Sequence, residues 1–192
     1  YSRIDKDGLL GVSDTVNAMQ DCCLFHSEDV GHSALDLLKK NRAWLVSAWH
    51  VVFKRRPVMG ERFTVHTWPY QFKGIFGCRN FLMETPDKEV LAYADSRWFY
   101  FDPPTGQPTK IDDGEKNAYP TEPAYDMEYS SRKVKCPENL TLVEEVNVCQ
   151  NYLDTNHHVN NGQYIRLAVN VLPIDFEVSE FRAEFRLAAK MG

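Results

Sequence analysis

Apolar residues recur at helical spacing near the start of the chain and alternate with polar residues after it. Val16, Met19 and Cys23 share one face of a helix that Ser13 or Asp14 would cap and that runs to about residue 26. A shorter segment, 34–40, has the same period. Four strand-like runs rich in Val, Phe, Trp and Tyr follow, at 43–53, 62–68, 72–84 and 90–101. A helical block followed by consecutive strands predicts an α+β fold built on an antiparallel sheet.

The pattern is interrupted after residue 101 by a stretch rich in proline and polar residues. This stretch, 102 to about 130, is typical of a linker that crosses the surface rather than of a helix or strand. Strand-like sequence resumes at 134–148. We then expect a helix from about 160 to 172, ended by Pro173, and a strand from about 176 to 188.

Two stretches after the linker match two stretches before it. Residues 46–60 align without gaps with 178–192, at an offset of 178 − 46 = 132, and five positions are identical. Residues 4–7 align with 153–156 at an offset of 153 − 4 = 149. Two matches in the same order predict tandem copies of one fold. The predicted parts are a first copy at 1–106, a linker at 107–133 and a second copy at 134–192.

The two copies differ in the length of strand sequence that they contain. The first copy continues for 101 − 60 = 41 residues of strand-like sequence beyond Gly60, whereas the second stops at Gly192. We therefore expect the second copy to be incomplete here, with about three strands of chain following Gly192 in the native protein.

Composition narrows the class of protein. The 192 residues are 43% hydrophobic and 26% charged, with a net charge of −5, which argues against a nucleic-acid partner. Apolar runs are shorter than the roughly 18 residues of a membrane span, so no membrane partner is expected. Five cysteines without C-x-x-C spacing argue against disulfides and a thiolate zinc site, and favour a reduced, cytoplasmic protein. No cofactor is expected.

The densest polar cluster spans 151–161, between strand-like sequence and the predicted helix. Asp154, Asn156 and His158 alternate, so in extended backbone they point to the same side. The helix that follows offers N–H groups and a positive dipole end, which suit polarisation of a carbonyl oxygen. The first copy has Asp5, Asp7 and Leu9 at the equivalent positions. Only the second copy thus has the amide and the imidazole, which suggests that one copy binds and the other does chemistry.

Other interpretations of this cluster remain open. Asp and Asn are ordinary helix caps, and such a run is often only a turn. Metal binding by His157 and His158 is disfavoured because adjacent side chains diverge and a third ligand at zinc spacing is lacking.

Residues 154–161, Asp-Thr-Asn-His-His-Val-Asn-Asn, with Tyr164 and Ile165, resemble the D-x-N-x-H-V-N-N-x-x-Y-I signature of acyl-ACP thioesterases. The first half resembles strand segments of the same family at 42–47, 60–62, 67–69, 72–74 and 79–81. The resemblance implies tandem hotdog domains, each a long helix wrapped by an antiparallel sheet. It also implies hydrolysis of a fatty acyl-ACP thioester to free fatty acid and carrier protein, in fatty acid biosynthesis.

The resemblance assigns roles by position. Asp154 would orient the Asn156 amide, which would contact the thioester carbonyl or the attacking water, and His158 would hydrogen-bond or transfer a proton. The family has an acidic residue on the next strand, where this chain has Glu184. Plant relatives often carry Cys directly after this Glu, but this chain has Phe185, which excludes a cysteine nucleophile there. Water activated by Glu184 with His158 assisting is the preferred mechanism; the alternative is His158 as base, oriented by Glu184.

The acyl chain of the substrate requires a buried apolar slot, for which the first copy has candidates. They are Met19, Trp44, Val46 and Phe81, although for any single one of them core packing is the more common role. Acyl carrier protein is acidic, so an acidic enzyme needs a local basic patch, and 39–42, 54–56 and 132–135 are candidates. An acyl-CoA thioesterase and a non-catalytic acyl-binding protein are alternatives, and a homodimer is compatible with the sequence.

Overall fold

The computed structural model describes residues 2–154, 158–189 and 191 of the chain. The strands are β1 (Ala43–Phe53), β2 (Thr64–Lys73), β3 (Phe76–Glu84), β4 (Val90–Asp102), β5 (Gln107–Pro108) and β6 (Glu180–Glu184). The helices are α1 (Val12–Asp29), α2 (Ala34–Lys39), α3 (Asp113–Ala118), a 3₁₀ turn (Gln150–Tyr152) and α4 (Asn161–Asn170). None of the described helices is long and apolar enough to cross a membrane.

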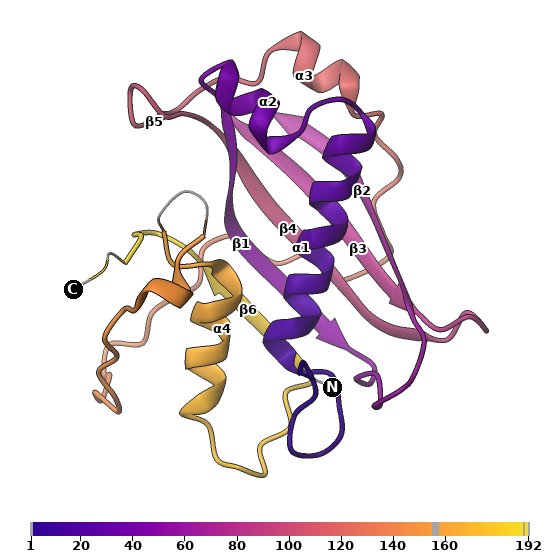
Figure 1. Cartoon of the computed structure of the whole chain (residues 1–192), viewed down its shortest axis with the longest axis vertical. Coiled ribbons are helices and arrows are strands. Elements are labelled where there is room, and N and C mark those ends of the chain that lie inside the picture. Colours follow the sequence, from indigo (N-terminus) through magenta and orange to yellow (C-terminus); the bar gives the residue numbers. More distant parts are fainter. Residues whose placement is uncertain (1, 155–157, 190, 192) are drawn as a thin grey trace.

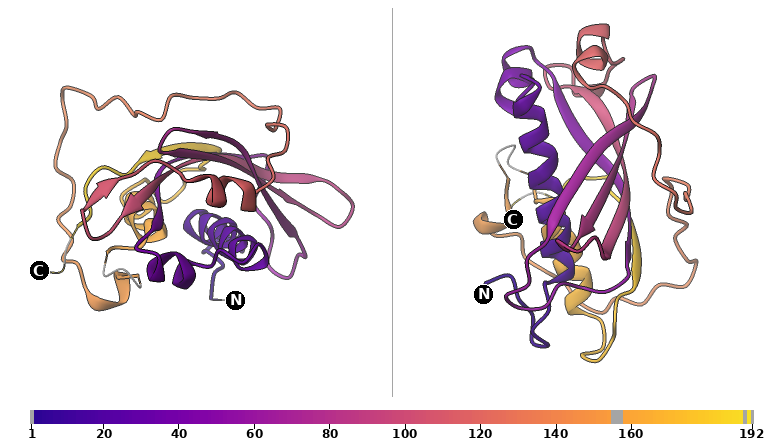
Figure 2. Two further views of the ribbon diagram at one scale, coloured as in Figure 1. Left: turned by 90° about the horizontal axis from the view of Figure 1, so that it is seen from above. Right: turned by 90° about the vertical axis from the view of Figure 1, so that its right-hand side faces the viewer.

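One antiparallel sheet organises the molecule. Its strands follow the order β2-β3-β4-β1-β6, and the short β5 pairs with β4. Figures 1 and 2 show α1 and α4 side by side on one face of this sheet. The chain between α3 and α4 crosses the opposite face, so that the two faces are a helix face and a linker face (Figure 2). The predicted α+β class is confirmed.

The long helix α1 forms the centre of the hydrophobic core. Val16 and Met19 are fully buried against the sheet, as their spacing predicted. The N-cap is Gly11, however, and the prediction that Ser13 or Asp14 caps the helix was wrong. Both residues lie in the first turn, where they face Arg166 of α4 at 3.5 and 3.4 Å. Their polar atoms thus serve the contact between two helices rather than the helix end.

The predicted strands in the first copy are confirmed, with one boundary error. We placed a break between residues 68 and 72, but β2 continues through Pro69 to Lys73. Proline is tolerated there because β2 is an edge strand and its register shifts between Pro69 and Gln71. The turn instead falls at Gly74, whose φ of 63° favours glycine.

Two predictions about the middle of the chain were wrong. The linker contains a helix, α3, whose N-cap Asp112 accepts a hydrogen bond from the Glu115 N–H at 2.9 Å. The expected strand at 134–148 does not form: this segment lies off the sheet, and the described chain offers it no paired strand edge. Its Leu140, Leu142 and Val143 are at least 70% exposed. Alternating apolar residues alone do not make a strand without a partner.

The structure confirms the tandem repeat through the pairing of β1 with β6. The two strands are antiparallel, and His50 lies opposite Arg182, its own equivalent at the offset of 132. On either side, Ala48 lies opposite Glu184 and Val52 opposite Glu180. A strand that pairs in this way with its own copy implies a pseudo-two-fold axis between the two copies. The second copy contributes α4 and the five-residue β6, which is shorter than the strand predicted at 176–188.

Candidate active site

The residues on either side of 155–157 in the polar cluster make contacts that already occur once in the chain. In the first copy, Ile4 and Leu10 form an isolated bridge, and the Asp5 N–H donates to the Leu9 oxygen at 2.8 Å. The Leu9 N–H in turn donates to Asp5 Oδ1 at 3.1 Å, and Gly11 begins the helix. One aspartate therefore closes the turn through both its backbone and its side chain.

The second copy repeats this arrangement at the offset of 149. Leu153 and Val159 form the bridge, the Asp154 N–H donates to the His158 oxygen at 2.8 Å, and the His158 N–H donates to Asp154 Oδ1 at 3.2 Å. Asn160 then caps α4 by accepting from the Gly162 N–H at 2.8 Å. The equivalence of the two turns confirms the second of the two sequence matches.

The two turns differ in what they present. In the first copy Leu9 is half-buried and bridges to Val58, and the Asp5 carboxylate pairs with Arg56. In the second copy His158 is exposed, and the residue at the offset of 132 from Arg56 is Ala188. The same backbone therefore packs a leucine in one copy and presents an imidazole to solvent in the other.

The start of α4 is held against α1. Asn161 Nδ2 donates to Gln20 Oε1 at 3.4 Å, and Gly162 is buried against Asn17. Because Asn160 takes up one N–H of the first turn, the helix offers fewer unpaired donors to a carbonyl oxygen than its position suggested. Its positive dipole end remains beside the turn that contains Asp154 and His158.

Asn156 lies outside the described residues, as do Thr155 and His157. The structure therefore leaves the predicted role of Asn156 and the question of metal binding by His157 and His158 where the sequence left them. Within the described part of the chain, no three His, Cys, Asp or Glu side chains lie together as a metal site would require.

The side chain of Glu184, at the end of β6, is 6% exposed, and three donors surround its carboxylate. Arg186 donates to Oε2 at 2.8 Å, the Val134 N–H donates to Oε2 at 3.0 Å, and Arg132 donates to Oε1 at 3.3 Å. The hydrogen bond from Arg186 and that from Val134 hold the pKa of Glu184 below its usual range. The carboxylate is therefore kept ionised by the linker and by its own strand.

Glu184 and its neighbour Phe185 point to opposite faces of the sheet. Glu184 contacts linker residues, whereas Phe185 packs against Tyr164 of α4, with ring centroids 5.8 Å apart. No hydrogen bond or ion pair joins Glu184 to His158 among the described residues. The two proposed proton-transfer groups thus have different surroundings, one on the linker face and one at the turn before α4.

The four candidate acyl-binding residues fall into two groups. Met19, Val46 and Phe81 belong to one core cluster and are at most 7% exposed. Trp44 instead packs on Tyr100 in a second cluster, with ring centroids 4.9 Å apart, and its indole N–H donates to Glu115 at 2.7 Å. The structure brings the first three together and places Trp44 elsewhere.

A cleft of about 310 Å³ next to Glu184 was missed in the sequence. Its aromatic side chains come from β3, β4 and the residue after β6, and its two guanidinium groups come from the linker and from Arg186, so the lining residues are far apart in the chain. The lining residues are Ser47, Ile75, Phe76, Phe99, Pro108, Arg132, Phe185 and Arg186. The one sequence signal was the bulky Phe185 beside Glu184, which by itself does not reveal a cleft.

Curved antiparallel sheet, long central helix and a second copy across a pseudo-two-fold axis define a tandem hotdog protein. Family models for the acyl-ACP thioesterase N-terminal and C-terminal domains match residues 1–119 and 137–187. The chain belongs to the acyl-ACP thioesterase family.

Individual relatives agree with this assignment. The chain is 27% identical to acyl-[acyl-carrier-protein] hydrolase FATB2, chloroplastic, of Cuphea viscosissima, over 85% of this chain and 43% of that protein. It is 26% identical to the chloroplastic palmitoyl-acyl carrier protein thioesterase of Arabidopsis thaliana, over 90% and 45%. The crystal structure of an acyl-ACP thioesterase from Bacteroides thetaiotaomicron, 25% identical, matches all of this chain and 79% of that one, with a TM-score of 0.90. The chain thus spans less than half the length of these two curated relatives.

Proposed function

We propose that this protein hydrolyses the thioester of a fatty acyl group attached to acyl carrier protein, releasing free fatty acid and the carrier. Family membership supports the reaction class, and the plant relatives carry this activity in their names. In this proposal residues 1–106 bind the acyl chain and 134–192 carry the chemistry, joined by 107–133. A cytoplasmic location is part of the proposal and rests on the cysteine pattern alone.

The observation that carries the proposal is the repeated turn. Two turns with the same hydrogen bonds end in Leu9 in one copy and in the exposed His158 in the other. An exposed imidazole gives the fold no packing that a leucine would not give better, so a chemical role is its natural explanation. Its place beside the positive end of α4 suits a reaction that develops negative charge on a carbonyl oxygen.

The described contacts support a division of roles. Asp154 fixes the turn by accepting the His158 N–H and so positions the imidazole. His158 would take a proton from water as the water attacks the thioester carbon, and would then return it to the departing thiolate. Asn156 keeps the role that the family resemblance gives it, which is to hold the carbonyl oxygen or the water.

Between the two candidate bases, the surroundings of Glu184 favour His158. A carboxylate that accepts hydrogen bonds from Arg186, Val134 and Arg132 and has a lowered pKa is a weak base. Glu184 would then be a positioning residue that holds the linker on β6. This choice reverses the order of preference that the sequence suggested.

For the acyl chain, we propose a slot between α1 and the sheet, lined by Met19, Val46 and Phe81. These side chains are closely packed, so the slot would open only when a chain enters. Trp44 would border it from the neighbouring cluster. Met19→Trp should shorten the longest acyl chain that is hydrolysed, and an unchanged chain-length profile would contradict the slot.

The test uses the full-length protein and acyl-ACP and acyl-CoA of the same chain length. His158→Ala should lower kcat by about 10²–10⁴-fold. Leu9→Ala is its matched control in the first copy and should leave kcat unchanged. Asn156→Ala with Asp7→Ala forms a second matched pair. No turnover by the wild type on either substrate would exclude the enzyme and favour an acyl-binding protein, and turnover of acyl-CoA alone would change the substrate.

Glu184→Gln separates the two bases. It keeps an acceptor for the Val134 N–H and removes the negative charge. If His158 is the base, this variant should retain most of kcat and the acid side of the pH–rate profile should keep its shape. A loss of kcat as large as that of His158→Ala, in a variant that unfolds at the wild-type temperature, would return the base to Glu184.

A further inference from the structure

The three basic clusters of the chain differ in how far their charges are neutralised. At 54–56, Arg55 pairs with Glu61 and Glu89 at 2.7 and 2.6 Å, and Arg56 pairs with Asp5. Two of its three charges are thus met by carboxylates of the same molecule, whereas the exposed Lys54 lies over the Tyr93 ring at 5.6 Å. An acidic partner that bound there would have to compete with these pairs.

The cluster at 39–42 is likewise mostly neutralised. Lys39 pairs with Asp36 at 2.9 Å, and Arg42 pairs with Asp102 at 2.9 Å. Lys40 alone forms no ion pair among the described residues. One exposed lysine attracts a charged partner only weakly in physiological salt.

The third cluster keeps its charge. We define the basic surface as Arg132, Lys133, Lys135, Arg182 and Arg186. Its ion pairs in the described structure reach one carboxylate only, that of Glu184, to which Arg132 and Arg186 both bind. Lys133 and Lys135 are exposed and pair with no described carboxylate. Two carboxylates of β6 lie beside these five cations, Glu184 and the exposed Glu180, so the local charge is 5 − 2 = +3 in a chain of net charge −5.

The backbone holds these charges in place. Arg182 on β6 donates to the Ser131 oxygen and, at 3.2 Å, to the Lys133 oxygen, so the linker is fastened where its lysines occur. Arg186 donates to the Val134 oxygen at 3.3 Å. The guanidinium groups of Arg182 and Arg186, fixed by these hydrogen bonds, lose less side-chain freedom on binding than those of a flexible tail would.

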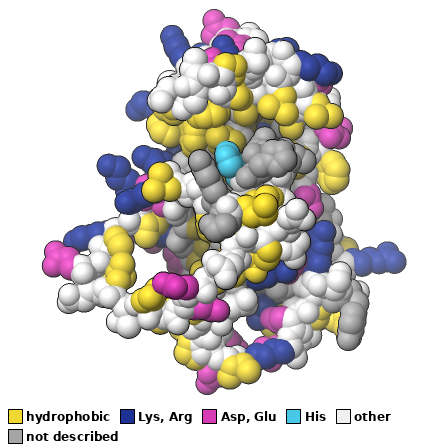
Figure 3. Space-filling model, turned by 60° about the vertical axis from the view of Figure 1, so that its left-hand side comes forward, with side chains coloured by type: hydrophobic (Ala, Val, Ile, Leu, Met, Phe, Trp, Pro, Cys, Tyr) yellow, Lys and Arg dark blue, Asp and Glu magenta, His cyan; other side chains and the backbone are white. Residues whose placement is uncertain are grey.

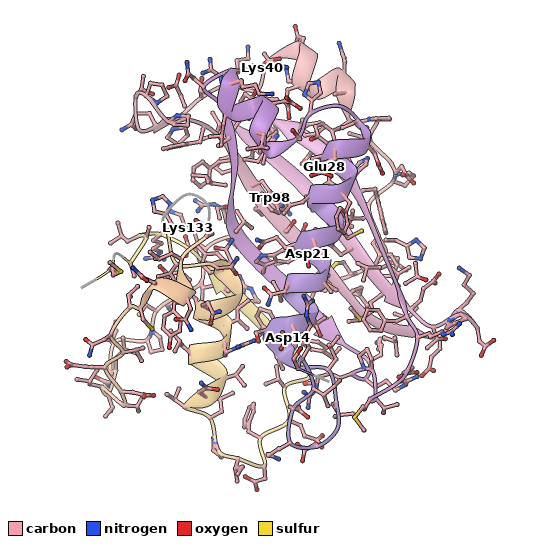
Figure 4. All side chains as sticks on the ribbon, viewed as in Figure 1. Asp14, Asp21, Glu28, Lys40, Trp98 and Lys133 are labelled. Carbon is pink, nitrogen blue, oxygen red and sulfur yellow. The ribbon has the colours of Figure 1, made fainter. Side chains whose placement is uncertain are left out.

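The basic surface borders the cleft. Arg132 and Arg186 line the cleft, and Arg132 lies over the Phe76 ring at 5.6 Å. Figure 4 places Lys133 at the level of the start of α4, and Lys40 at the far end of the molecule near α2. The acidic side chains of α1 labelled there lie on the other side of α4. Figure 3 shows Lys and Arg side chains gathered on one flank of the histidine that it displays.

We propose that the basic surface is the docking site of the acidic carrier protein, an inference that rests on the proposed function. An acidic helix of the carrier would lie across Lys133 and Lys135, which leaves the carrier's acyl-bearing arm next to the cleft. Charge complementarity of this kind accelerates association and selects the partner more than it adds affinity. It also explains how a protein of net charge −5 meets an acidic partner.

The experiment compares two double charge reversals in the full-length protein. Lys133→Glu with Lys135→Glu should weaken binding of holo acyl carrier protein by about tenfold or more and raise KM for acyl-ACP to match. The matched control, Lys39→Glu with Lys40→Glu, should change neither value. Raising the salt should weaken wild-type binding and shrink the difference between the variants.

A neutral acyl-N-acetylcysteamine thioester serves as the internal control, because it reaches the active site without a carrier. Its kcat and KM should be the same in the wild type and both double variants. Equal carrier binding by the 133/135 variant and the wild type, or a larger loss in the 39/40 variant, would overturn the docking site. A KM that rises for acyl-CoA but not for acyl-ACP would also overturn it.

These outcomes distinguish the docking site from the proposed function. Turnover of the neutral thioester without any effect of the 133/135 variant on the carrier leaves the thioesterase standing and removes the docking site. Charge-dependent binding of the carrier without hydrolysis of any thioester removes the thioesterase instead.

Discussion

Asn80 anchors the linker to the sheet, and its removal should loosen that contact measurably. The side chain is fully buried on the linker face of β3. Its Oδ1 accepts from the Tyr125 N–H at 3.0 Å and from the Tyr129 hydroxyl at 2.9 Å, and its Nδ2 donates to the Ala94 oxygen at 3.2 Å. One side chain thus ties two points of the linker to two strands.

The cost of Asn80→Ala follows from these bonds. Three hydrogen bonds at about 1 kcal/mol each, with the partly buried Tyr125 N–H left without an acceptor, give a loss of about 2–4 kcal/mol in the free energy of unfolding. For a chain of this size, that loss lowers Tm by about 5–15 °C. Tyr129→Phe is the matched control. It should cost about 1 kcal/mol or less, because the exposed hydroxyl has one proton and donates it either to Asn80 Oδ1 or to the Tyr125 oxygen at 2.8 Å.

Urea unfolding and limited trypsin digestion together test this reasoning. Urea reports the stability, and trypsin reports whether the linker has been released, because Arg132 and Lys133 provide cleavage sites just beyond the anchored part. Asn80→Ala should be cut there faster than the wild type at equal fraction folded. A stability within 0.5 kcal/mol of the wild type, on the order of ordinary surface substitutions, would refute the role given to Asn80.

Three further predictions follow from the structure. Glu61 has a pKa of about 2 because of its hydrogen bond from Arg55. Its stabilising effect should therefore be full above about pH 4.3 and be lost as the pH falls through 2. The free energies of unfolding of Glu61→Gln and the wild type should converge over this range. Gly162→Ala should destabilise by about 1–3 kcal/mol, because the new Cβ would lie 2.1 Å from Asn17 Oδ1; Asn17→Ala should relieve this in a double-mutant cycle, and additive effects would argue against the clash. Glu115→Ala should cost about 2–4 kcal/mol by leaving its indole and imidazole partners without an acceptor, while Glu115→Gln, which still accepts, should cost less in thermal unfolding.

Where local pattern and tertiary contact agreed, the sequence predicted the fold well. Residues 43–53, rich in Val, Trp and Phe, form β1 with the predicted bounds, because both edges of that strand find partners. Residues 134–148 carry a similar pattern but have no described partner and form no strand. Pro69 was expected to end a strand. At an edge of the sheet, however, the lack of an N–H on proline costs no hydrogen bond between strands. In each case the neighbour in space, and not the local pattern, made the difference.

The candidate site shows the same limit. The alternation of Asp154 and His158 located the turn, and its repeat at Asp5 and Leu9 showed which position had changed. The pattern did not show that Glu184 is surrounded by donors, because two of them, Arg132 and the Val134 N–H, are about 50 residues away along the chain. That contact altered which residue is proposed as the base.

The sequence by itself determined the α+β class, the two copies and the polar turn before α4, because each follows from the spacing of apolar and polar residues within a short stretch of chain. Only the tertiary structure decided what the charges do. Arg55, Arg56 and Lys39 have carboxylate partners, whereas Lys133 and Lys135 pair with none that the structure describes. Three basic clusters that look alike in sequence therefore differ in their free charge, because a Coulomb interaction depends on distance in space and not on separation along the chain.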